Sequence, residues 1–91
     1  MSEARLDRWL FCARFYRSRE LAKAACESGR IRINGQRVEK PGREIRPGDI
    51  LTLPRPREAI AVRVLALAAR RGKAIEAQGL YELLDPRAPA P

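Results

Sequence analysis

Basic side chains that could bind phosphate recur at short intervals near the start of the sequence. Between residues 5 and 30 only Asp7, Glu20 and Glu27 oppose them. A guanidinium offers a planar fork of donors that can grip phosphate oxygens at two points and can stack on nucleobases. This spacing predicts a polyanion-binding surface. Its seven cations are Arg5, Arg8, Arg14, Arg17, Arg19, Lys23 and Arg30.

The overall charge favours the same class of partner. The 91 residues carry 19 Lys+Arg, 11 Asp+Glu and no His, a net charge of +8. Such a balance suits nucleic acid, through counterion release, or an anionic membrane surface. A GC-rich genome would also favour Arg over Lys, so the argument depends on where the arginines lie.

Groups for catalysis or metal binding are scarce. The sequence shows no His base, activated nucleophile, glycine-rich phosphate loop or carboxylate cluster. Asp7 follows Arg5-Leu6 much as the catalytic aspartate of pseudouridine synthases does, but Arg8 replaces the Thr that follows there. We expect Asp7 to orient arginines or favour a helix N-terminus. Two cysteines without His cannot supply four zinc ligands, so we expect free thiols and no metal. Because the groups named above are missing, we also expect no cofactor and no catalysis.

Two short helices are predicted to carry these cations. Leu6, Trp9, Leu10 and Ala13 recur at helical spacing, which indicates a helix over about 4–16 with Ser2 as its cap.

A second helix begins after Ser18 as cap, with Glu20 in its first turn, and ends before Gly29. Its expected buried face is Leu21, Ala24, Ala25 and Ser28. At 100° per residue, Arg5 and Arg8 then flank the first apolar seam, while Arg19 and Lys23 point away from the second.

After residue 30 the apolar residues alternate with a period of two, which is typical of β-strands. Ile31 and Ile33 alternate with arginines before Asn34-Gly35, a dipeptide typical of tight hairpin turns. Further strands are expected at 50–53, after the turn Pro47-Gly48-Asp49, and at 60–65. We predict an α+β fold in which two short helices pack on a small curled antiparallel sheet.

The C-terminal part is less regular. Residues 70–73 form a basic turn, 74–84 favour a short helix weakened by Gly79, and the proline-rich 85–91 favour a disordered tail. We therefore expect one domain over 1–84. Trp9 is expected in the core, and core packing is favoured over base stacking for Phe11 and Phe15.

Several motifs together resemble the S-four RNA-binding domain. They are Arg5-Leu6-Asp7-Arg8-Trp9-Leu10, Ala13-Arg14-Phe15-Tyr16, Ser18-Arg19, Gly29-Arg30-Ile31, Asn34-Gly35 and Pro47-Gly48-Asp49-Ile50. The Trp-Leu-x-x-Ala-Arg-Phe-Tyr run and the later Arg70-Arg71 are most similar to the ribosome-associated heat-shock protein fifteen family. That family usually continues into a basic C-terminal helical extension, which the proline-rich end of this sequence does not resemble.

The resemblance implies noncatalytic binding of structured RNA, in particular ribosomal RNA of the large subunit, during ribosome rescue or recycling under stress. The sequence has no apolar run near the ~20 residues that span a bilayer and no export signal, so we expect a cytoplasmic protein, and we expect a monomer with no membrane partner. Alternatives are a module that brings a separate enzyme to RNA, a membrane adaptor and an RNA-modifying enzyme. The expected RNA-binding residues are Arg5, Arg8, Arg14, Arg17, Ser18, Arg19, Lys23, Arg30, Asn34 and Gly35.

Overall fold

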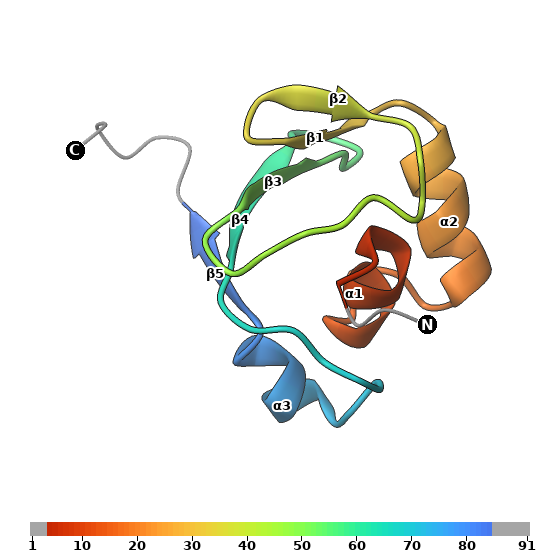
Figure 1. Ribbon diagram of the computed structural model, residues 1–91. Helices are drawn as coiled ribbons and strands as arrows, with labels where there is room; N and C mark the ends of the chain where they lie inside the picture. The colour runs from red at the N-terminus through yellow and green to blue at the C-terminus, as the bar shows by residue number, and fades with distance from the viewer. Residues whose placement is uncertain (1–3, 85–91) are drawn as a thin grey trace.

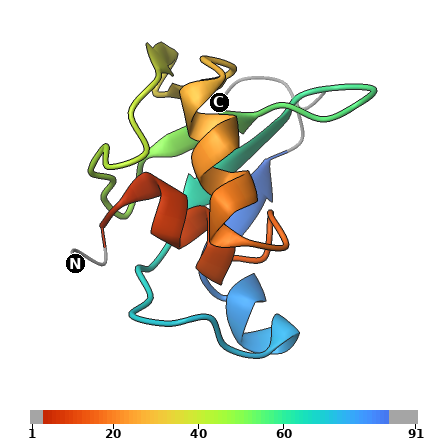
Figure 2. The ribbon, with the colours of Figure 1, turned by 90° about the vertical axis from the view of Figure 1, so that its right-hand side faces the viewer.

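Helices α1 and α2 lie on one side of an open antiparallel sheet, and α3 lies near its β5 end (Figures 1 and 2). A computed structural model describes residues 4–84. The strands run in the spatial order β2-β1-β3-β4-β5, and every neighbouring pair is antiparallel. The predicted α+β class is confirmed. In chain order the elements are α1 (Leu6–Cys12), α2 (Arg19–Glu27), β1 (Ile31–Ile33), β2 (Gln36–Val38), β3 (Ile50–Leu53), β4 (Ile60–Val64), α3 (Ala74–Gln78) and β5 (Tyr81–Leu84).

The core fills the space between the sheet and the first two helices. The predicted α1 seam is fully or almost fully buried, and so is Trp9 within it, whose Nε1 donates to the Ala66 carbonyl over 2.8 Å. Alternate residues of the central strands face this seam, as period-two burial requires. They are Ile31, Ile33, Leu51, Leu53, Val62 and Val64.

The free backbone N–H groups at the N-terminus of α1 form hydrogen bonds with a neighbouring loop. Its first two N–H groups, of Leu6 and Asp7, donate to the carbonyls of Arg43 and Pro41. Nearby Ile45 enters the core at 1 % exposure. These contacts use the donors that a helix start leaves unpaired. The expected cap, Ser2, lies outside the described residues.

Helix α1 ends four residues before the predicted limit. Its C-cap is Ala13, and Arg14 then adopts a left-handed backbone with φ of 67°. This conformation stops helical hydrogen bonding and turns the chain towards α2. The prediction of helix to Tyr16 was therefore wrong at its end.

Helix α2 has the predicted ends but a different buried face. Ser18 Oγ accepts the Leu21 N–H over 3.1 Å, and Gly29 stops the helix with φ of 76°. The buried residues are Ala22 and Cys26, whereas Leu21 is 47 % exposed. The predicted seam was thus wrong by one position, because small Ala22 and Cys26 allow close approach to α1.

The hairpin turn is confirmed. Asn34 and Gly35 both have positive φ, 51° and 84°, as a two-residue turn between twisted strands requires. The Asn34 side chain also joins this turn to the next one. Its Nδ2 donates to Asp49 Oδ1, and its Oδ1 accepts the Ile50 N–H over 3.0 Å.

The C-terminal segment is a short helix followed by a strand. Helix α3 stops at Gln78, and Tyr81–Leu84 pairs with β4 as the fifth strand. The predicted helix to Leu84 was wrong because Val64 offers a strand edge and the Tyr81 ring packs 4.6 Å from that of Phe15. The expected tail, 85–91, lies outside the described residues.

Candidate nucleic-acid interface

A buried carboxylate holds two of the predicted RNA-binding arginines. Asp7 is only 3 % exposed, and its oxygens accept bonds from Arg5 Nε at 2.9 Å and Arg5 Nη2 at 3.0 Å. Arg19 Nη2 lies 3.6 Å from Asp7 Oδ2. Both arginine side chains remain about one-third exposed. Asp7 therefore orients arginines from α1 and α2 towards solvent, as its sequence context predicted.

The charge on Asp7 is stabilised by these neighbours. Burial opposes ionisation, but hydrogen bonds from Arg5 and from the Arg8 N–H, together with the positive charges of Arg5 and Arg19, outweigh it. The pKa of Asp7 is consequently below its ordinary value. The carboxylate stays ionised at neutral pH, and Arg5 keeps a bidentate partner.

The loop between β4 and α3 is fastened to α1 by arginines. Arg8 Nη2 donates to the Ala69 carbonyl, and Arg14 donates through Nη2 to the Gly72 carbonyl over 2.9 Å. In return, Arg71 Nη1 donates to the Arg17 carbonyl over 3.0 Å. These bonds bring a second group of cations beside the helices, although 54 to 61 residues separate the partners in sequence.

Three adjoining surface hollows connect these cations. Arg19 lines the first and second hollows, and Arg70 and Arg71 line the second and third. The carboxylates among their linings are Asp7, Glu20 and Glu76. We call the cationic lining residues the arginine band: Arg5, Arg8, Arg14, Arg19, Lys23, Arg70, Arg71 and Lys73.

Five of the ten predicted RNA-binding residues lie in the arginine band, namely Arg5, Arg8, Arg14, Arg19 and Lys23. The other five line none of the three hollows. The Arg17 carbonyl holds Arg71, Ser18 caps α2, exposed Arg30 precedes β1, and Asn34 with Gly35 forms the hairpin turn.

Arg70, Arg71 and Lys73 were not among the RNA-binding residues predicted from sequence. The run of basic residues at 70–73 was a visible signal, but its distance in sequence from the helices concealed their proximity.

The aromatic residues beside the arginine band differ in their surroundings. Phe15 packs against the core, as predicted, between Trp9 and Tyr81. Phe11 is only partly buried and lies outside the core cluster, so its predicted core position was wrong. The Arg71 guanidinium lies over the Phe11 ring, 4.5 Å from the centroid. Phe11 lies within α1, on a side of the helix that contacts the loop before α3 and not the sheet.

Both cysteines are buried and free. Burial raises the pKa of Cys26 to about 12 and also raises the pKa of Cys12. Both thiols are therefore neutral at physiological pH. Within residues 4–84 no group of three or more His, Cys, Asp or Glu side chains could hold a metal ion.

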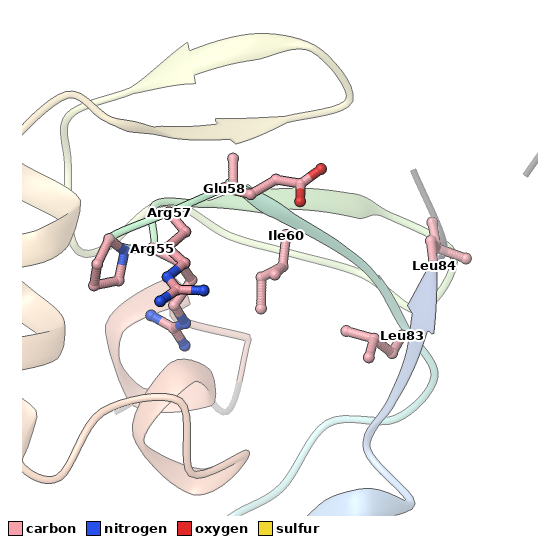
Figure 3. A pocket seen from close by; sticks show the side chains of 8 residues that line it. Arg55, Arg57, Glu58, Ile60, Leu83 and Leu84 are labelled. Atoms are coloured by element: carbon pink, nitrogen blue, oxygen red, sulfur yellow. The ribbon is translucent and has the colours of Figure 1, made fainter. Parts of the chain in front are cut away.

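A different hollow lies at the β5 edge of the sheet (Figure 3). Its lining is mainly apolar, with Ile60, Leu83 and Leu84 on the strands and Arg55, Arg57 and Glu58 on the β3–β4 loop. This hollow shares no lining residue with the arginine band.

Among the described residues, no helix is long and apolar enough to cross a bilayer.

Comparison with known proteins agrees with the resemblance to the S-four domain. The family model of the S4 domain, the S-four domain of the sequence analysis, matches residues 4–51, just over half of the chain. A Heat shock protein 15 homolog from Haemophilus influenzae is 42% identical over 80 residues, which are 88% of this chain and 60% of that protein. The chain thus spans about three-fifths of the length of that relative.

Two further relatives are covered more fully. The RQC P-site tRNA stabilizing factor of Halalkalibacterium halodurans is 37% identical over 79 residues, 87% of this chain and 88% of that protein. A solved structure described as the trimeric structure of Vibrio cholerae Heat Shock Protein 15 has a TM-score of 0.82 and 38% identity. The match covers 88% of this chain and 80% of that one.

Proposed function

Because the chain belongs to the S4 domain family, we propose that it binds structured RNA through the arginine band, without catalysing a reaction. The observation that carries this proposal is the continuity of eight cations across α1, α2 and the loop before α3. Asp7 and the loop carbonyls hold four of these side chains in place. Fixed donors lose less conformational freedom when they bind phosphate than mobile ones do.

The band suits recognition of backbone shape. Guanidinium groups on two helices and a loop can contact several phosphates of a folded RNA at once. We propose the remaining predicted residues as outer contacts that extend the surface towards the hairpin. These outer contacts are Arg17, Ser18, Arg30, Asn34 and Gly35.

We further propose that the RNA is ribosomal RNA of the large subunit and that the protein acts in the cytoplasm, in ribosome rescue or recycling under stress. The relatives support a ribosomal setting, since one is named a heat shock protein and another a P-site tRNA stabilizing factor. The arginine band supports this role because ribosomal RNA presents densely folded phosphates.

The test is a sucrose-gradient profile of cell lysate probed for this protein. We expect the wild-type chain to comigrate with large-subunit particles. Changing Arg19 and Lys23 together to Ala should remove at least about nine-tenths of that signal, because two charge-assisted phosphate contacts are lost.

The control removes two exposed cations outside the arginine band, Arg46→Ala with Arg57→Ala. This variant has the same net charge as the first and should still comigrate. Equal loss in both variants would show that charge alone, without the band, explains binding. Unchanged comigration of the Arg19 and Lys23 variant would contradict the proposed site.

A further inference from the structure

The middle hollow of the arginine band differs in composition from its neighbours. We call it the central hollow, and the described residues that line it are Arg8, Phe11, Cys12, Arg19, Ala69, Arg70 and Arg71. An aromatic ring, a neutral thiol and a methyl group therefore stand among four guanidinium groups. The first and third hollows contain no aromatic side chain.

Phe11 and Arg71 form a cation–π pair within the central hollow. The Arg71 guanidinium carbon lies 4.5 Å from the centre of the Phe11 ring, and Nη1 donates to the Arg17 carbonyl. Nε of Arg71 is buried without a hydrogen-bond partner in the described part of the chain. The guanidinium plane is thus positioned by the ring and by one carbonyl, which suits stacking better than a network of in-plane bonds would.

The apolar part of this hollow exceeds what phosphate binding requires. Phosphate needs donors, and the flanking hollows supply these without aromatic groups. A nucleobase needs a flat surface to stack on and donors at its edges, and bases in single-stranded loops and bulges stack on aromatic rings and Arg guanidinium planes.

We propose that the central hollow binds one unpaired RNA base, stacked on the guanidinium plane of Arg71 over Phe11. This inference rests on the proposed RNA-binding function. Arg19 and Arg70 also line the hollow and supply N–H donors for acceptor atoms of the base or for its flanking phosphates. Arg8 donates to the Ala69 carbonyl and so holds the loop against α1.

The test compares two RNA hairpins that differ only at one bulged nucleotide. One carries 2-aminopurine, a fluorescent adenine analogue, and the other an abasic site, so their phosphate charges are equal. We expect the purified full chain to bind the base-containing hairpin about tenfold more tightly and to quench its fluorescence.

Two substitutions examine the stack itself. Arg71→Lys keeps the positive charge but removes the plane, and Phe11→Leu removes the ring beneath it. Each should reduce the tenfold preference to less than about threefold. The matched control Arg57→Lys, in the exposed β3–β4 loop, should leave the preference unchanged. Circular dichroism of each variant verifies folding. The comparison of the two hairpins with the wild-type chain does not depend on any substitution.

The outcomes separate this inference from the proposed function. Equal, salt-sensitive affinity for both hairpins would overturn the base site while RNA binding through phosphates remained. Absence of binding to either hairpin at low salt would overturn both proposals. A preference for the base that survives both Arg71→Lys and Phe11→Leu would overturn the assignment to the central hollow.

Discussion

Asp7 illustrates how one buried charge organises a surface. Its carboxylate binds Arg5 through two hydrogen bonds, attracts Arg19 and accepts the Arg8 N–H. An unpaired carboxylate at this depth would be costly, but here each oxygen has partners. The same side chain thus joins the start of α1 to the first residue of α2.

Replacing Asp7 should change how stability depends on pH. The folded pKa of Asp7 lies below its ordinary value, so ionised Asp7 contributes stability above about pH 4, and that contribution is lost as pH falls through the folded pKa. Asp7→Asn should lower the free energy of unfolding by about 1–3 kcal/mol at pH 7. Urea denaturation at several pH values measures this difference, which should shrink towards pH 2.

The control for that experiment is Glu20→Gln, which removes an exposed carboxylate from the same hollow. It should cost less than about 1 kcal/mol at pH 7. A difference between wild type and Asp7→Asn that stayed constant from pH 7 to pH 2 would contradict the assigned role of Asp7.

At the level of single residues, the sequence predicts short-range relations well. The orientation of Arg5 by Asp7 and the cap at Ser18 depend on neighbours two or three positions away, and both are confirmed. The position of Arg71 beside Arg17 depends on how the loop folds back, which no local pattern reports.

Helix α2 was predicted at the correct place in the sequence, but with the wrong buried face. Hydrophobicity favoured Leu21 as the inward position, yet Ala22 and Cys26 are buried. Cysteine is among the most frequently buried residue types, so Cys26 was the signal for the true phase. The narrow face brings α2 close to α1, which in turn brings Arg19 near Asp7.

Two substitutions on α2 can test this phase. Leu21→Ala should change the free energy of unfolding by less than about 0.5 kcal/mol, because Leu21 is largely exposed. Ala22→Leu should lower it by about 1–3 kcal/mol, because the added methyl groups overfill the contact with α1. Chemical denaturation of both variants measures this contrast, and the reverse order would favour the phase expected from sequence.

The remaining elements differ in how far local sequence patterns could predict them. The hairpin and the strand at 50–53 could be predicted because their turn residues and alternation are local. The end of α1 at Cys12 could not, since it depends on the left-handed backbone of Arg14, a residue type that rarely adopts this conformation. The strand at 81–84 could not either, since it is set by pairing with distant β4. Residues after Gly79 form a strand only because β4 provides an edge for pairing.

At the level of the whole molecule, we predict a monomer. The net charge of +8 disfavours self-association, and the band concentrates much of that charge on one surface. Size-exclusion chromatography with light scattering should give the mass of one chain across micromolar concentrations.

A mass of three chains would contradict this prediction and would match the trimeric description of the relative from Vibrio cholerae. In that case Leu83→Glu, in the apolar hollow at the β5 edge, would show whether this hollow forms the contact, because Leu83 is 63 % exposed.

The bonds between α1 and the loop before α3 also have a consequence for synthesis. Trp9 reaches Ala66, Arg8 reaches Ala69 and Arg14 reaches Gly72, across 57 to 61 positions of sequence. A nascent chain that has grown only to β4 has its first two helices but lacks the loop that completes the arginine band. Competence to bind RNA through the whole band therefore requires that the loop before α3 has left the ribosomal exit tunnel.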